Sequence, residues 1–268
     1  MIKSGVGTPS YATLATWAQV TGAWDSDYPI TNLANLRSIR SVAKASGSGV
    51  RAFTFILPAA VSLQFLAMLD HNGAAASTVR YRLFSDNNPD PVGNAGAIVH
   101  DSGTLSLLPG GANADWPQNH PYVLSAAVTA RSCRIDLSSH ATAWQIGAFE
   151  IAAWWEWTDV ETPREFGLNN NDVVAAMPNG ITHEMSQWAP RVIKGTRGVV
   201  TQTEIHTTAL DFQLATGLRN PFVWVWDFND STTWPREVVL VHNASLPSPR
   251  AVEYPGGRVA FDFEEWLR

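Results

Sequence analysis

Two tryptophans in turn-rich segments are the residues of this sequence best suited to contact a ligand. Trp116 lies within residues 113–117 and Trp234 within residues 232–235, and each is followed directly by a proline. An aromatic ring on a loop can stack on the apolar face of a sugar. It can equally anchor a protein interface or fill the space beneath its own loop. We therefore take Trp116 and Trp234 as the candidate glycan or interface aromatics.

Residue patterns that could hold a metal ion or a cofactor are incomplete. His183 and Glu184 begin like the helix of a zinc protease, but Gln187 occupies the position of the second histidine. Residues 86–97 resemble a calcium loop, yet Ala97 stands where a bidentate glutamate is needed. Two Gly-x-Gly pairs lack the third glycine of a dinucleotide-binding loop. We expect no metal site and no cofactor site.

Catalytic patterns are equally incomplete. The sequence contains neither a phosphate-binding Walker loop nor the G-x-S-x-G turn of a serine hydrolase. Hydrolysis of a glycoside needs two carboxylates that face one cleft. Glu161 and Glu165 lie in an expected linker, and adjacent strand residues such as Glu264 and Glu265 point to opposite faces. We expect no catalytic residues and no enzyme activity.

Composition indicates a folded, mildly acidic protein. The chain has 268 residues, of which 45% are hydrophobic and 16% charged, with a formal net charge of −6. This much apolar material excludes a disordered chain, and the net negative charge argues against a nucleic-acid binder that works through a basic surface. Fifteen of the 18 basic residues are arginine and 12 residues are tryptophan. Both types are enriched in buried interfaces, which hints at assembly.

Cysteine content and hydropathy favour synthesis in a reducing cytoplasm without membrane insertion. The single cysteine, Cys133, excludes an intramolecular disulfide, and its alternating surroundings make it a small core residue. The N-terminus lacks the apolar region of a secretion signal. The most apolar stretch, residues 52–69, is too short and too interrupted to span a bilayer. We expect two buried strands there, meeting in a turn at Pro58.

The elements that must position any site are mainly β-strands. Short segments alternate between apolar and polar residues, and clusters of glycine, proline, asparagine and aspartate separate them. The clearest are residues 53–57, 63–69, 79–84 and 132–137. Period-two patterning with frequent turns indicates an antiparallel sandwich.

One segment reads as a helix. Thr201 and Glu204 have the spacing of a capping box, apolar residues follow at helical intervals, and Gly217 can take the left-handed C-terminal position. We expect a helix near residues 203–216. Residues 158–165 are polar and contain a proline, so we expect a linker there between domains at residues 1–157 and 166–268.

The order of the strand segments in the N-terminal half resembles a discoidin or galactose-binding-like jelly roll, in the form found in tail proteins of tailed phages. The resemblance covers roughly residues 10–157. It rests on the segments 28–33 (YPITNL), 53–58, 67–72, 79–85, 134–137 (RIDL) and 145–151 (QIGAFEI). It contains no sugar-binding set of residues that can be transferred by position.

The C-terminal half is similar to the belt-forming domain of phage distal-tail and tail-tube-like proteins. The matching segments are residues 221–227, 237–240 and 259–265. Together the two resemblances imply an all-β chain. They imply an N-terminal jelly-roll β-sandwich and a second β-sandwich with one packed α-helix.

These resemblances imply a structural component of a siphophage tail tip or baseplate. Such a protein is made in the host cytoplasm and resides in the virion. It forms part of a homo-oligomeric ring between the tail tube and the hub or fibre proteins. Residues 158–268 carry nine basic and 14 acidic groups, so this half would line a channel through which DNA passes as non-specific cargo. The alternative is an adhesin module that binds a host-surface glycan.

Overall fold

The structure, a computed structural model, describes residues 4–36, 42–89, 97–111, 118–157, 160–168, 173–176, 182–185, 190–218, 220–253 and 256–266. The chain divides into two compact units. Unit 1 comprises Met1–Thr158 and Phe222–Val239, and unit 2 comprises Asp159–Pro221 and Leu240–Arg268.

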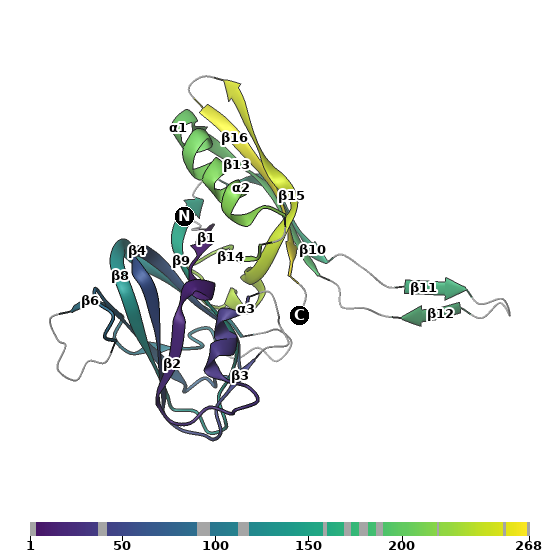
Figure 1. Ribbon diagram of the computed structural model, residues 1–268. Helices are drawn as coiled ribbons and strands as arrows, with labels where there is room; N and C mark the ends of the chain where they lie inside the picture. The colour runs from purple at the N-terminus through teal and green to yellow at the C-terminus, as the bar shows by residue number, and fades with distance from the viewer. Residues whose placement is uncertain are drawn as a thin grey trace. The chain divides into compact units, whose positions relative to one another are not determined.

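Unit 1 is an antiparallel jelly-roll β-sandwich (Figure 1). Its main strand order is β14-β1-β9-β4-β8-β5-β6, while β2 pairs with β4, β3 with β9 and β7 with β5. The strands are β1 (Ser4–Ser10), β2 (Thr16–Thr21), β3 (Ala43–Lys44), β4 (Arg51–His71), β5 (Thr78–Phe84), β6 (Ile98–Asp101), β7 (Leu105–Ser106), β8 (His120–Ser138), β9 (Gln145–Trp157) and β14 (Phe222–Val225). The short helices are η1 (Ala12–Leu14), η2 (Ile30–Ala34) and α3 (Trp234–Glu237).

An aromatic cluster forms the centre of the unit 1 core. Phe53 and Phe55 alternate on β4 and are fully buried, as the period-two pattern predicts. Trp17 on β2 packs against Phe55, and its ring meets Phe149 of β9 edge-on at 5.7 Å between centroids. Cys133 is buried in the same core, which confirms its structural role and raises the pKa of its thiol.

The expected turn at Pro58 is wrong, because β4 continues through it as one 21-residue strand. Pairing with β8 shifts register between Ile56 and Val61, and Pro58 lies inside that irregularity. A proline at a bulge removes no ladder hydrogen bond, so the strand tolerates it. The Arg131 side chain donates to the carbonyl of Pro58 at 3.3 Å and so secures the bulge.

Unit 2 contains one antiparallel sheet with a helix packed on it. The strand order is β10-β13-β16-β15, from β10 (Val160–Leu168), β13 (Arg191–Thr201), β16 (Gly256–Glu265) and β15 (Val238–Glu253, from Leu240 onward in this unit). A separate hairpin pairs β11 (Val173–Ala176) with β12 (Thr182–Met185). His183 and Glu184 lie on strand β12, which excludes a zinc-protease helix at that position.

The predicted helix is confirmed as a continuous helical segment formed by α1 (Gln202–Glu204), the π-helical turn η3 (Ile205–Ala209) and α2 (Leu210–Thr216). Thr201 Oγ1 accepts the backbone N–H of Glu204 at 3.2 Å, as the capping pattern requires. Gly217 ends the helix with a φ of 49°. Phe212 is buried, and its ring lies 6.4 Å from that of Phe263 on β16.

The division of the chain differs from the expected one in two ways. Most of the expected linker 158–165 lies within strand β10, which pairs with β13. Phe222–Val239 belong to unit 1, because β14 pairs with β1 near the N-terminus. Pairing between strands more than 200 residues apart leaves no local pattern in the sequence. The sequence therefore could not show that Phe222–Val239 belong to unit 1.

Candidate functional site

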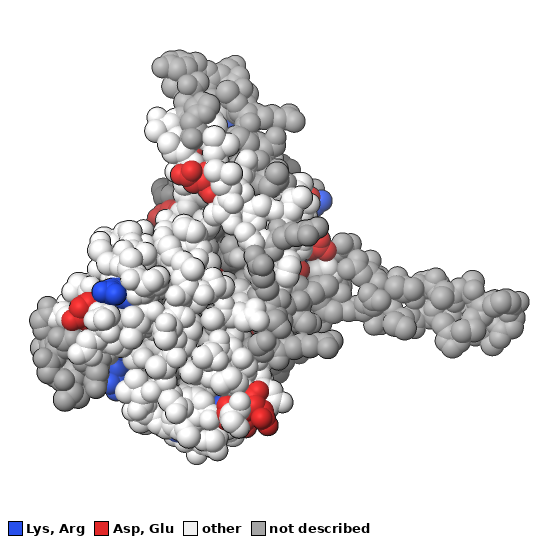
Figure 2. Space-filling model, in the orientation of Figure 1, with Lys and Arg blue, Asp and Glu red and all other residues white. Residues whose placement is uncertain are grey.

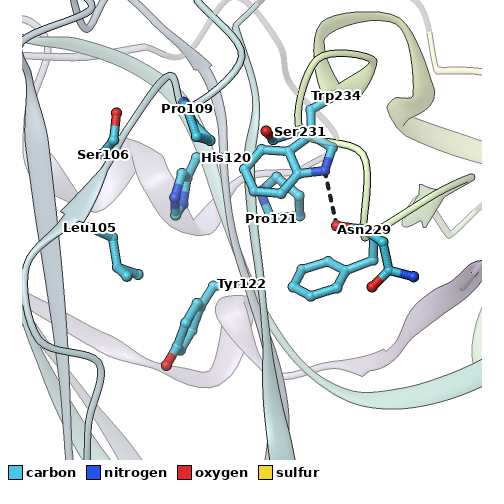
Figure 3. A pocket seen from close by; sticks show the side chains of 10 residues that line it. Leu105, Ser106, Pro109, His120, Pro121, Tyr122, Asn229, Ser231 and Trp234 are labelled. Carbon is cyan, nitrogen blue, oxygen red and sulfur yellow. Dashed lines mark hydrogen bonds between the residues drawn. The ribbon is translucent and has the colours of Figure 1, made fainter.

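A cavity of about 460 Å³ opens in unit 1 between the first residues of β8 and the segment that follows β14. Its size falls within the range of ~300–1,000 Å³ that is usual for small-molecule sites. Figure 3 shows Leu105 and Tyr122 on one side and Trp234 and Asn229 on the other, with His120 and Pro121 between them. The lining residues are Leu105, Ser106, Pro109, His120, Pro121, Tyr122, Phe228, Asn229, Ser231 and Trp234.

Short-range hydrogen bonds hold the segment that carries Trp234. The carboxylate of Asp230 accepts the backbone N–H of Thr232 at 3.0 Å, and a one-turn helix, α3, begins directly afterwards. The Trp234 indole N–H donates to the carbonyl of Phe228 at 3.3 Å, and the two rings stack with centroids 6.0 Å apart. The Trp234 ring is therefore held in place before any ligand arrives.

Neighbouring loops bring this segment to the start of β8. Asn119 donates to the carbonyl of Val238 at 2.7 Å and accepts the backbone N–H of Asp70 at 2.8 Å. A side chain at Gly110 would bring its Cβ within 2.5 Å of the Ser231 carbonyl oxygen, so only glycine permits the approach of these two loops. Residues far apart in sequence thus form one wall of the cavity.

His120 forms the base of the cavity as a neutral imidazole. Its side chain is almost fully buried, and burial lowers its pKa to about 4. Its Nδ1 lies 3.0 Å from the hydroxyl of Tyr81, and the Trp234 ring stands perpendicular to it at 5.6 Å. Burial also raises the pKa of Tyr81 well above its ordinary value, so this phenol keeps its proton. The base of the cavity is therefore uncharged at neutral pH.

Tyr122 lines the cavity on the side across from Trp234, and contacts with Tyr81 and His100 hold its side chain in place. Its ring stacks on Tyr81 at 5.2 Å, and its hydroxyl lies 2.7 Å from Nε2 of His100. Burial raises the pKa of Tyr122, and the charge of Asp101 adds to this effect. Arg80 hydrogen-bonds Asp101 and lowers the pKa of that carboxyl to about 2.

The chemistry of the lining suits a neutral molecule that has both apolar and hydroxylated surfaces. The aromatic rings come from Tyr122, Phe228 and Trp234. Ser106 and Ser231 contribute hydroxyls, and Asn229 contributes an amide. None of the ten described residues around the cavity is Asp, Glu, Lys or Arg, so an ionic ligand finds no counter-charge in its lining.

The structure places one of the two sequence-selected aromatics in this cavity. Trp234 lines it, whereas Trp116 lies outside the described residues. His120, Tyr122 and Phe228 were not selected from the sequence, because in it they read as ordinary strand and loop residues.

The described part of the chain holds no cluster of three or more His, Cys, Asp or Glu side chains that could bind a metal ion. No described helix is long and apolar enough to cross a membrane.

No protein-family model and no curated protein matches the chain. Among solved structures, it is similar to the lectin domain of lectinolysin complexed with Lewis b antigen, with a TM-score of 0.41 and 13% identity over 55% of this chain and 98% of that one. A chitosan-binding module from Paenibacillus sp. IK-5 gives 0.40 and 11%, over 54% and 99%. The family 32 carbohydrate-binding module of C. perfringens NanJ, solved with galactose, gives 0.39 and 9%, over 56% and 98%.

Proposed function

We propose that unit 1 binds a neutral glycan in the cavity bounded by Tyr122, Phe228 and Trp234. The observation that carries this proposal is the combination of rigid aromatic rings with hydroxyl and amide groups in an uncharged lining. A pyranose ring has an apolar face of C–H groups and a rim of hydroxyls. Such a ligand needs an aromatic surface and a few polar partners, which this cavity supplies.

The charge distribution on the face shown in Figure 2 fits a neutral ligand better than a nucleic acid. On the face shown in Figure 2, Lys, Arg, Asp and Glu side chains lie in a few separate groups, and uncharged side chains cover most of the described area. A phosphate-rich polymer needs a concentrated basic surface. The net charge of −6 opposes such binding as well.

We propose that binding occurs without turnover. Glycoside hydrolysis requires a pair of carboxylates about 5–10 Å apart across the sugar. No Asp or Glu is among the described residues that line the cavity, and His120 is kept neutral by burial. The predicted lack of enzyme activity is therefore part of this proposal. Incubating the protein with the glycans it binds and analysing the products by mass spectrometry tests it.

A glycan array followed by isothermal titration calorimetry tests the binding proposal. The parent protein should bind one or more neutral glycans, and Trp234→Ala should weaken binding at least about tenfold, the equivalent of ~1.4 kcal/mol. Trp234→Phe retains a ring and should recover part of the affinity. Val99→Ala, on an exposed side chain of β6, is the matched control and should bind like the parent. Absence of binding to every array glycan would refute the proposal.

A structural role in a phage tail is the second candidate. Leu210 and Leu214 lie one turn apart on α2 and are 40% and 83% exposed, and Leu218 follows at 49%. Exposed apolar side chains grouped in this way favour a protein interface. A homo-oligomeric ring in the virion, with residues 158–268 around a DNA channel and the tail tube, hub and fibre proteins as neighbours, would use such a surface.

Native mass spectrometry tests this second candidate. Ring formation predicts a closed multimer of the 29.2 kDa chain that Leu214→Glu dissociates. Leu14→Glu, an exposed leucine of unit 1, is the control and should leave the multimer intact. A chain that stays monomeric alone and in purified particles would exclude the ring.

A further inference from the structure

We infer that the glycan site extends beyond one sugar, with a second subsite built around Trp154 that accepts the next residue of a neutral oligosaccharide. This inference rests on the proposed glycan-binding function and specifies its ligand class. It starts from a smaller cavity of about 260 Å³ in unit 1, lined by Gln64, Val123, Leu124, Ser125, Trp154, Glu156, Phe228 and Asn229.

The two cavities share a wall. Phe228 and Asn229 line both of them, so a ligand that passes this pair of residues contacts both spaces. Along β8, the larger cavity touches residues 120–122 and the smaller one touches residues 123–125. At about 3.3 Å per strand residue, the middle residues of these two groups, Pro121 and Leu124, lie about 10 Å apart along β8. A disaccharide spans about this length from end to end, so one disaccharide can contact both groups of residues.

The smaller cavity is suited to be a subsite and not a separate site. Its volume of 260 Å³ is below the ~300 Å³ at which independent small-molecule pockets begin. Its neighbour of 460 Å³ exceeds this threshold and offers the larger number of aromatic rings. One ligand that fills both cavities therefore explains the small space better than two unrelated ligands do.

The Trp154 ring is held rigidly at this subsite. It stacks on the buried ring of Phe65, with centroids 5.1 Å apart and an interplanar angle of 29°. On β1, a Cβ atom at Gly5 would lie 2.3 Å from Trp154 Cζ2, so glycine makes room for the indole. The ring is half-buried, so part of it stays exposed beside the cavity that it lines. A ring fixed in this way loses little conformational entropy when a sugar stacks on it.

Polar groups around Trp154 set the charge preference. Glu156 lies two residues further along β9, so it projects from the same face of the strand and lines the same cavity. Its carboxylate can accept hydrogen bonds from sugar hydroxyls, whereas it repels the carboxylate of a uronic acid. The Gln64 amide donates to the carbonyl of Leu124 at 3.3 Å, and this bond fixes the Gln64 side chain in the lining of the smaller cavity. The subsite therefore selects a neutral sugar over an acidic one.

An array that grades glycan length tests the inference on the full chain. It carries glucose, galactose, mannose and N-acetylglucosamine as mono-, di- and tetrasaccharides, together with uronic-acid oligosaccharides of the same lengths. For the sugar that binds, calorimetry should give a disaccharide affinity at least about tenfold above that of the monosaccharide, the equivalent of ~1.4 kcal/mol. The tetrasaccharide should add little to this gain.

Two variants test whether the higher affinity for the disaccharide comes from the subsite around Trp154. Ser125→Trp adds bulk at an exposed position beside the subsite and should reduce disaccharide affinity to that of the monosaccharide, without removing any core contact. Trp154→Ala should do the same, and its thermal unfolding should be measured because the variant also loses the contact with Phe65. Both variants should keep monosaccharide affinity within about twofold, which is less than ~0.4 kcal/mol.

The outcomes separate the inference from the proposed function. Equal affinity for mono- and disaccharides, or a Ser125→Trp variant that binds the disaccharide like the parent, would overturn the second subsite and leave the glycan site standing. Failure to bind any glycan would overturn both. Glu156→Gln should increase binding of the uronic-acid oligosaccharides severalfold, and an unchanged preference for neutral sugars would contradict the proposed role of this carboxylate.

Discussion

The hydroxyl of Tyr81 and Nδ1 of His120 lie 3.0 Å apart in the fully buried base of the unit 1 cavity. Burial keeps the phenol protonated and the imidazole neutral, so the two groups share one hydrogen bond between uncharged partners. This hydrogen bond joins β5 to the start of β8 and fixes the imidazole against which Trp234 packs.

Removing the Tyr81 hydroxyl should destabilise unit 1. Tyr81→Phe leaves Nδ1 of His120 buried without its hydrogen-bond partner, which costs about 1–3 kcal/mol. Urea unfolding followed by circular dichroism measures the loss. Tyr28→Phe removes the hydroxyl of a tyrosine that is 37% exposed, so its free energy of unfolding should stay close to that of the parent. Equal stability of the two variants would contradict the role given to the Tyr81–His120 bond.

Buried histidines should make the protein less stable as the pH falls below neutral. Burial lowers the pKa of His71 to about 3 and that of His120 to about 4, and the charges of His120 and His140 lower that of His71 further. Because these folded-state values are below the ordinary 6.5, the unfolded chain binds more protons than the folded one. The stability contributed by the neutral imidazoles is complete above pH 6.5 and is lost as the pH falls from about 6.5 to about 4 for His120 and to about 3 for His71.

His71→Asn tests this dependence. The asparagine carbonyl can accept the backbone N–H of Gly73, which His71 Nδ1 accepts at 3.2 Å, but it does not titrate. The melting temperature of the variant should therefore fall less than that of the parent between pH 7 and pH 5. Identical pH slopes in the parent and the variant would show that His71 is not the titrating group.

Glu150 should give the opposite pH dependence, so that the free energy of unfolding decreases as the pH rises. Burial on β9 raises its pKa to about 8, and the hydrogen bond from the Ile151 N–H offsets part of the shift. The folded state then holds a proton that the unfolded state releases above about pH 4.5, so stability falls as the pH rises from 4.5 to 8. Glu150→Gln removes this titration and should be more stable than the parent at pH 9. Chemical denaturation at pH 5, 7 and 9 measures the difference, and parallel profiles would contradict it.

The sheet of unit 2 contains a buried ion pair whose loss should be costly. Arg191 Nη2 and Nε donate to the two carboxylate oxygens of Glu265 at 2.5 and 3.0 Å, and both side chains are nearly buried. Glu265→Gln breaks this pair, which should destabilise unit 2 by about 3–5 kcal/mol. The exposed pair of Lys194 and Asp262, 3.3 Å apart, provides the control, because Asp262→Asn should cost less than about 1 kcal/mol. Similar losses in both variants would contradict this account.

Local patterns in the sequence predicted individual elements well. The helix near residues 203–216 was predicted from Thr201, which caps its start, and from Gly217, which ends it. Each residue acts only on the helical turn next to it. The alternation at residues 79–84 and 132–137 likewise predicted parts of β5 and β8. These signals are local, so they can be read without knowledge of the fold.

Features that depend on distant contacts could not be predicted. In the sequence, Gly5 and Gly7 form one of the two incomplete Gly-x-Gly pairs, whereas in the structure they make room for Trp154 and Phe65. Of the cavity residues, only Trp234 had a recognisable sequence context. The others become a site because the segment after β14 lies against the start of β8, and no local pattern encodes that contact.

A crystal structure of the protein with the neutral glycan that binds it most tightly on the array tests the central claim most directly. We expect one sugar ring in contact with Trp234, Tyr122 and Phe228, and a second sugar ring on Trp154. Glycan density at another place on the chain, with this cavity empty, would contradict the account.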